Sequence, residues 1–179
     1  PSTLRTVAAA VDFFPWLAQR CQLAELQSLP QGTALVVDDE PLARRAVTHA
    51  LDKARIRSVA VEDAETALRL LTDNRFDLIV LDVSLPGMDG FSLCSRLRTL
   101  PAHGRTPVVF VTSLNDFQAR TSSTMSGGND FIAKPFLFVE LSLKALMFVL
   151  RYQIESAMVS VGGLAAGGTE PGQAGLQPS

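Results

Sequence analysis

Four apolar runs of this chain are each followed by polar side chains that could form a single binding site. The runs span residues 35–37, 78–81, 108–111 and, more briefly, 131–132. The polar residues at or just after their ends are, in chain order, the pair Asp38–Asp39, Asp82, the pair Thr112–Ser113 and Lys134. In an open parallel α/β sheet, ligands bind outside the carboxyl ends of the strands. The sequence therefore predicts one pocket with three carboxylates, a hydroxyl and an ammonium group, which suits Mg²⁺ and a phosphoryl group.

Strand and helix patterns alternate five times along the middle of the chain. Short apolar runs typical of buried strands lie at 34–37, 58–61, 78–81, 108–111 and 130–132. Helical spacing of apolar residues, or a polar helical pattern, follows them at 42–51, 64–71, 91–100, 115–126 and 137–154. Because the strands are apolar throughout, the alternation predicts an α/β fold with a doubly wound, five-stranded parallel sheet and helices on both faces.

The bulk composition excludes several functions. With 179 residues, of which 47% are hydrophobic, the chain can bury the core of one domain and carry extensions. The formal net charge is −2, so the basic face that usually binds nucleic acid is not expected. Cys21 and Cys94 lack C-x-x-C spacing and are expected to be reduced thiols of a cytosolic protein. The most apolar stretch, 136–150, is shorter than the roughly 20 residues of a membrane span, and we expect a soluble protein.

Three units are expected along the chain. They are an N-terminal helical extension or linker at 1–31, a main domain at 32–156, and a flexible Gly- and Pro-rich tail at 157–179. Within the first unit, Pro15 should end one helix and a second should begin at Trp16. The chain opens at Pro1 inside a helical pattern and shows no signal-peptide pattern, so we expect a piece of a longer protein.

Asp82 is the candidate nucleophile. A carboxylate can attack phosphorus and hold an acyl phosphate. Taken alone, Asp82 is equally well explained as a cap on the turn after its strand. Lys134 would supply a compact positive charge for phosphoryl oxygens, Thr112 a hydroxyl, and the small Ser113 room for the phosphate. Their joint occurrence, each at a strand end, favours a phosphoryl site over coincidence.

Asp38 and Asp39 carry the expectation of a metal ion. Mg²⁺ takes oxygen ligands, usually one or two carboxylates together with waters and phosphate oxygens. Asp39 and Asp82 would bind it directly and Asp38 through water, and the backbone carbonyl of Ser84 would add a ligand. The alternative is that the acidic pair only stabilises the N-terminus of the following helix.

The motifs around these residues resemble those of the receiver domain of two-component response regulators, the CheY-like family. They are Val-Val-Asp-Asp-Glu at 36–40, Leu-Asp-Val-Ser-Leu-Pro-Gly-Met-Asp-Gly at 81–90, Val-Thr-Ser at 111–113 and Ala-Lys-Pro-Phe at 133–136. The resemblance covers about residues 33–155 and implies a flavodoxin-like sheet with strand order 2-1-3-4-5.

The resemblance also implies residue roles. These are Asp82 as phosphoacceptor, Asp38 and Asp39 as the Mg²⁺-binding acidic pair, and Thr112 with Lys134 as the phosphate-sensing pair. Phe131 matches the aromatic switch position, and Lys134–Pro135 would be joined by a cis peptide bond. Leu114, two residues after Thr112, would shield the phosphate from water and slow self-dephosphorylation.

A receiver domain implies partners. The phosphoryl donor would be a histidine kinase or a histidine phosphotransfer domain, because neither His49 nor His103 has the surroundings of a phosphohistidine site. The domain would catalyse only its own phosphorylation and dephosphorylation, in the bacterial cytoplasm, and would switch a surface of helix 4, strand 5 and helix 5 toward a downstream output domain or protein. The last helix is apolar nearly all round, so either the N-terminal helices or a homodimer partner would cover it, or the helix simply lies deeper in its own domain.

Two other functions stay open on the sequence alone. One is a degenerate receiver that serves as a dimerisation or docking module without phosphorylation. The other is a Mg²⁺-dependent phosphohydrolase with an Asp nucleophile. Haloacid-dehalogenase-like enzymes place Asp-x-Asp after their first strand, and neither 38–40 nor 82–84 fits that pattern.

Overall fold

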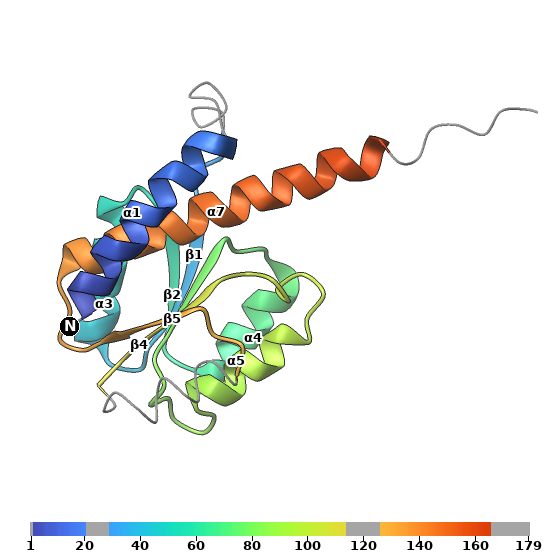
Figure 1. Ribbon diagram of the computed structural model, residues 1–179. Coiled ribbons are helices and arrows are strands. Elements are labelled where there is room, and N and C mark those ends of the chain that lie inside the picture. Colours follow the sequence, from blue (N-terminus) through green and yellow to red (C-terminus); the bar gives the residue numbers. More distant parts are fainter. Residues whose placement is uncertain (1, 21–28, 114–125, 166–179) are drawn as a thin grey trace, which may run out of the picture.

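The computed structural model describes residues 2–20, 29–113 and 126–165, and these contain a five-stranded parallel sheet (Figure 1). The strands are β1 (Thr33–Val37), β2 (Arg57–Val61), β3 (Leu78–Leu81), β4 (Val108–Thr112) and β5 (Asp130–Ala133). Their order across the sheet is β2-β1-β3-β4-β5, and every neighbouring pair is parallel. The predicted α/β fold and strand order are confirmed.

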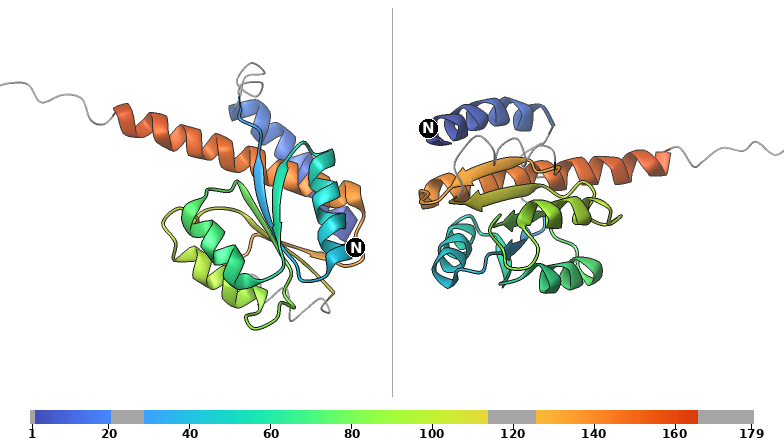
Figure 2. Two further views of the ribbon diagram at one scale, coloured as in Figure 1. Left: turned by 180° about the vertical axis from the view of Figure 1, so that it is seen from behind. Right: turned by 90° about the horizontal axis from the view of Figure 1, so that it is seen from below.

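Helices cover both faces of the sheet and add a further layer outside it. They are α1 (Ser2–Arg20), α3 (Pro41–Lys53), α4 (Ala64–Asp73), α5 (Gly90–Arg98) and α7 (Phe138–Ala165). Helices α3 and α7 pack together on one face, and α4 and α5 on the other. Helix α1 packs on the outside of α7, and α7 projects beyond the sheet (Figures 1 and 2). Within the described residues, no helix combines the length and apolar character that a membrane crossing requires.

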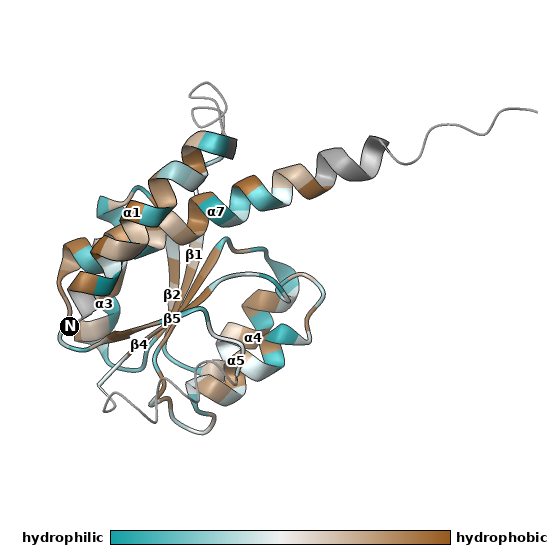
Figure 3. Cartoon of the chain, viewed as in Figure 1, coloured by the Kyte–Doolittle hydropathy of each residue, from teal (hydrophilic) through white to brown (hydrophobic). Residues whose placement is uncertain are grey.

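The core consists of two apolar clusters, one on each face of the sheet. Side chains alternate along a strand, so Leu35 and Val37 of β1 point into the α4–α5 cluster, whereas Val36 joins the α3–α7 cluster. On β5 the same alternation sends Phe131 toward α5 and Ile132 toward α7. The inner strands β1, β3 and β4 are hydrophobic along their length (Figure 3) because helices cover both of their faces, whereas the edge strand β2 is largely exposed.

Helix α1 runs through Pro15, and the prediction of a break there was wrong. A proline inside a helix removes one backbone hydrogen bond and crowds the preceding turn. Packing on α7 outweighs this cost: Phe13 is 4% exposed, Trp16 stacks on Phe13 with 5.5 Å between ring centroids, and Arg151 of α7 lies over the Trp16 ring. The part of the expected second helix at 21–28 lies outside the described residues.

Helix α7 continues to Ala165, so the start of the flexible tail at residue 157 was predicted too early. Each interior glycine costs a helix about 1 kcal/mol relative to alanine. Extending an existing helix is nevertheless much easier than nucleating a new one, and Gly162–Gly163 follow more than twenty helical residues. The helix expected at 115–126 falls on residues that, up to 125, lie outside the described part, as do Leu114 and Cys21. Cys94 is a buried free thiol whose pKa is raised by burial.

Candidate functional site

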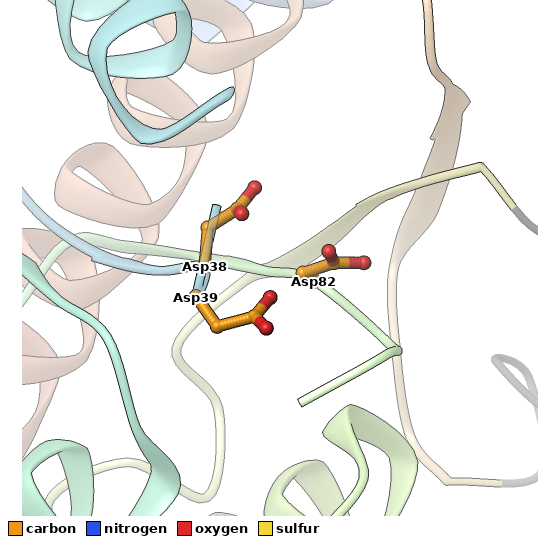
Figure 4. A group of neighbouring side chains, drawn as sticks. All are labelled: Asp38, Asp39 and Asp82. Carbon is orange, nitrogen blue, oxygen red and sulfur yellow. The ribbon is translucent and has the colours of Figure 1, made fainter. Parts of the chain in front are cut away.

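Three carboxylates meet at the carboxyl edge of the sheet. Strands β1 and β3 are paired neighbours, so Asp38 and Asp39 after β1 lie beside Asp82 after β3 (Figure 4). One oxygen from each carboxylate lies within 4.8 Å of the others. Asp38 and Asp82 are only 2% and 6% exposed, whereas Asp39 is exposed. The cluster therefore has two buried walls and one side open to solvent, and its oxygens can hold a divalent cation.

Lys134 reaches this cluster from the end of β5. Its Nζ donates to Asp38 Oδ2 at 2.8 Å and to Asp82 Oδ2 at 2.9 Å. The backbone N–H of Lys134 donates to the carbonyl of Thr112 at 2.9 Å, which ties the ends of β5 and β4 together. The Lys134–Pro135 peptide bond is cis. The ammonium thus bridges two buried carboxylates that would otherwise repel each other.

The cluster carries more negative than positive charge among the described residues. Burial raises the pKa of Asp38 despite its hydrogen bond and ion pair with Lys134, and the Asp82 carboxylate adds to the rise. Burial by itself lowers the pKa of Lys134, but hydrogen bonds and charge from Asp38 and Asp82 outweigh it, and the pKa is raised overall. Lys134 is therefore an ammonium ion. Burial disfavours the charged form of Asp38, and a cation bound in the cluster would stabilise that charge.

Backbone groups fix the two buried carboxylates in place. The N–H of Glu40 donates to Asp38 Oδ1 at 3.0 Å, and the N–H of Ser84 donates to Asp82 Oδ1 at 3.3 Å. Arg44 holds the carbonyl of Asp38 at 2.6 Å from α3. The site is therefore built on rigid elements, with its acceptor oxygens already oriented.

The remaining candidate residues lie on β4 and β5. Thr112, the last residue of β4, is fully buried and pairs in register with Ala133 of β5, while the following Ser113 is exposed. Phe131 is 3% exposed and lies in the α4–α5 cluster rather than in the acidic site. The structure thus brings Asp38, Asp39, Asp82 and Lys134 together and places Phe131 one layer away.

Sequence reasoning missed three residues of the site. Arg44 supports the Asp38 backbone, and Glu40 lies 4.0 Å from Lys134. Gly90, the first residue of α5, lies against the backbone carbonyl of Asp82. Glu40, the N-cap of α3, and Arg44 are four residues apart, and this spacing is the sequence signal that could have linked them.

The fold and the site together define a receiver domain of the two-component type. The response regulator receiver domain family matches residues 34–146 of this chain. The chain belongs to that family.

Relatives of known name agree with this assignment. The chain is 38% identical over 125 residues to the transcriptional activator protein IrlR of Burkholderia pseudomallei, which covers 70% of the chain and 53% of that protein. It is 33% identical over 122 residues to the heme response regulator HssR of Staphylococcus haemolyticus, covering 68% of the chain and 53% of that protein. The chain thus spans about half the length of these relatives.

Solved structures show the same architecture. The chemotaxis response regulator CheY4 of Vibrio cholerae superposes with a TM-score of 0.61 at 29% identity, covering 67% of this chain and 99% of that one. The receiver domain of the Francisella response regulator 1452 gives a TM-score of 0.62 at 28% identity, covering 67% and 98%.

Proposed function

We propose that this receiver domain accepts a phosphoryl group on a carboxylate oxygen of Asp82. The observation that carries the proposal is the pairing of this buried carboxylate with the Lys134 ammonium, 2.9 Å away, beside two further carboxylates. A negatively charged phosphoryl group needs such cationic partners, and a carboxylate held by a backbone N–H is a positioned nucleophile.

The donor is a phosphohistidine of a histidine kinase or a histidine phosphotransfer domain. An Asp82 oxygen forms the new O–P bond while the N–P bond of the donor breaks, and the imidazole nitrogen keeps the electron pair. The receiver contributes by holding the nucleophile and stabilising the charge on the transferring oxygens. It acts on itself and turns over no external substrate.

Mg²⁺ fits the acidic cluster. Asp39 and Asp82 are the direct carboxylate ligands in this proposal, Asp38 acts through water, and the backbone carbonyl of Ser84 adds a further oxygen. When bound, the ion supplies positive charge that neutralises the approaching phosphoryl group. The raised pKa of Asp38 agrees with this assignment, because burial disfavours the charged carboxylate and the Asp82 carboxylate beside it adds a smaller effect in the same direction.

The response to phosphorylation uses the ends of β4 and β5. Thr112 donates its hydroxyl to the phosphoryl group, Ser113 leaves space for it, and Lys134 moves its ion pair onto the new charge. Phe131 then repacks within its cluster. Such a local change in charge biases a two-state surface formed by β5 and the helices beside it.

The proposal extends to the binding partners of the receiver and to its location in the cell. The longer relatives carry sequence beyond the region matched here, and we propose that this receiver controls a downstream output domain or protein in the bacterial cytoplasm. A homodimer through α1 or α7 stays a prediction. Leu4, Val7, Val11 and Phe14 form an exposed apolar stripe on α1 that such a dimer could bury.

Mass spectrometry of the intact chain tests the function. With Mg²⁺ and acetyl phosphate, the chain should gain one phosphoryl group, and Asp82→Asn or removal of Mg²⁺ should abolish the gain. Asp73→Asn, at the end of α4, is the matched control and should behave as the parent. Absence of both phosphorylation and beryllofluoride binding would favour a phosphorylation-independent docking module, and turnover of a small phosphoester would favour a phosphohydrolase.

A further inference from the structure

Helix α1 uses one narrow stripe to pack on the receiver. Thr6, Ala10 and Phe13 recur at spacings of four and three residues, which places them on one face of the helix. They are 2%, 8% and 4% exposed, whereas Phe14 beside them is 62% exposed. The stripe faces α7, the helix against which α1 packs. Residues 2–20 lie outside the region that matches the receiver family, so this contact joins the receiver to a segment that the family model does not include.

The surface beneath α1 is charged. We call it the α1-docking face and define it as Asp130 of β5 with Glu140, Lys144 and Arg151 of α7. Glu140 and Lys144 are each 3% exposed. Thr6 donates to Glu140 at 3.3 Å, and Lys144 donates to Asp130 at 2.6 Å. Arg151 lies 4.9 Å from the ring centre of Trp16.

This contact has the properties of a reversible one. Burying the charged groups of Glu140 and Lys144 costs desolvation energy, which reduces the net stabilisation that the contact provides. The packing is also incomplete, because a pocket of about 220 Å³ remains between α1 and α7, with Phe13, Lys144 and Met147 among its lining residues. Phe13 is the one large apolar side chain of α1 that the contact buries fully, among the residues described. The described contacts that hold α1 on α7 include the buried Phe13 ring, the Thr6–Glu140 hydrogen bond and the Arg151–Trp16 contact.

The α1-docking face shares a short strand with the phosphoryl site. Asp130, which accepts from Lys144, is the first residue of β5, and Lys134, which binds Asp82, directly follows the last. Four strand residues span only about 13 Å. A shift of β5 that follows loss of the Lys134–Asp82 ion pair would therefore be felt at the Asp130–Lys144 pair under α1.

We propose that α1 is an intramolecular ligand of the α1-docking face and that modification of Asp82 weakens its docking. The inference rests on the proposed phosphorylation of Asp82. Its direction follows from complementarity: α1 fits the face as it stands beside an unmodified Asp82, so a change in that face reduces the fit. Helix α1 thereby controls access to this part of the receiver.

The chain carries its own reporter for this equilibrium. Trp16 is its single tryptophan, and it stacks on the anchor Phe13 under Arg151. The experiment follows acrylamide quenching of Trp16 and hydrogen exchange of peptides within 2–20 in the full chain. Both are measured with and without Mg²⁺ and beryllofluoride, which stands in for the phosphoryl group. Binding of beryllofluoride is verified separately by fluorine NMR.

Beryllofluoride should lower the hydrogen-exchange protection of α1 by about 5- to 150-fold, the usual range for coupling between two sites, and should increase quenching of Trp16. Asp82→Asn should remove the response. Phe13→Ala should leave α1 unprotected in both conditions, and by reciprocity should raise the affinity for beryllofluoride by the same factor. Phe14→Ala, the exposed neighbour, should behave as the parent, and Ala10→Glu should reproduce Phe13→Ala from a second position.

The outcomes separate the two proposals. If beryllofluoride binds and α1 protection does not change, or rises, the proposed release of α1 is wrong while the proposed function stands. If beryllofluoride does not bind, the proposed function fails first. Equal effects of Phe13→Ala and Phe14→Ala would show that α1 is not anchored through Phe13, which also overturns the inference.

Discussion

Gly90 lies against the backbone carbonyl of Asp82 so closely that a Cβ at position 90 would overlap the carbonyl oxygen. Its N–H also donates to the carbonyl of Val83 at 2.9 Å, so α5 begins directly beneath the proposed phosphoacceptor. Any side chain at position 90 must therefore push the backbone of Asp82 or the start of α5 out of place.

Gly90→Ala should destabilise the chain by about 1–3 kcal/mol and slow the modification of Asp82, because overpacking here displaces the nucleophile. Gly87→Ala is the matched control. Gly87 has a φ of 78° but open space around it, so alanine there should cost about 1–2 kcal/mol without slowing the modification. Urea unfolding and acetyl phosphate kinetics measure the two effects, and equal rates in both variants would contradict the prediction.

Mg²⁺ should stabilise the chain through the acidic cluster. At a concentration about 100 times its Kd, a ligand that binds only the folded state adds about 2.7 kcal/mol. Asp39→Asn should remove most of this gain, since it takes one of the three carboxylates from the cluster. Glu62→Gln removes an exposed acid outside the cluster and should keep the gain. Thermal unfolding of both variants with and without Mg²⁺ measures the stabilisation. If Mg²⁺ stabilised the two variants equally, the ion would bind outside the acidic cluster.

Much of this site could be predicted because strand ends are easy to find. Each apolar run of β1, β3 and β4 is long enough to mark a buried strand, and a parallel sheet then brings the residues that follow to one edge. The sequence predicts Asp38 and Asp82 in this way, whereas Lys134 follows the shorter apolar run of β5. Gly90 and Arg44 were not predicted, because their roles depend on how α5 and α3 approach the sheet, which strand patterns do not encode.

The N-terminal extension was harder to predict for a different reason. Pro15 is a strong local break signal, yet Phe13 and Trp16 on either side of it are held by contacts with α7. Those contacts join residues more than 120 positions apart, and no local pattern records them. The end of α7 was predicted too early for a related reason. Glycines at the end of a long helix only have to extend it, which costs less than starting a new helix.

Phe131→Ala should cost about 3–5 kcal/mol, because the ring is 3% exposed and its loss leaves a cavity in the α4–α5 cluster. Phe138→Ala provides the comparison on α7, where the ring is 50% exposed, and should cost less than about 1 kcal/mol. Urea unfolding measures both. Similar losses in the two variants would mean that Phe131 does not occupy a packed position.

Asp89 should give the stability a defined pH dependence. Its carboxylate caps α5 by accepting from the N–H of Ser92 at 2.8 Å, and this bond holds the pKa of Asp89 below its ordinary value of 3.8. Because the pKa of Asp89 is lowered by folding, the ionised carboxylate stabilises the folded state fully above pH 3.8. This stabilisation is lost as the pH falls through the lowered pKa.

Asp89→Ala should therefore cost about 1 kcal/mol near neutral pH and progressively less in acid. Asp89→Asn keeps a capping oxygen without a titrating group, so it should retain most of the stability and lose this acid dependence. Urea unfolding between neutral pH and pH 3 follows the difference between parent and variants. If the difference in unfolding free energy between the parent and Asp89→Ala did not change with pH, the charge of Asp89 would not contribute to the cap.

The length of helix α7 sets the rotation of its C-terminal end about the helix axis. At 28 residues it is about 42 Å long, and it leaves the sheet as one continuous rod. A rod of this kind transmits rotation as well as distance: each inserted residue turns whatever follows by about 100° and advances it by about 1.5 Å. The end of α7 at Ala165 is therefore held at a set rotation about the helix axis relative to the phosphoryl site. The number of residues in α7 therefore sets both how far the end of the helix lies from the sheet and which way it is turned.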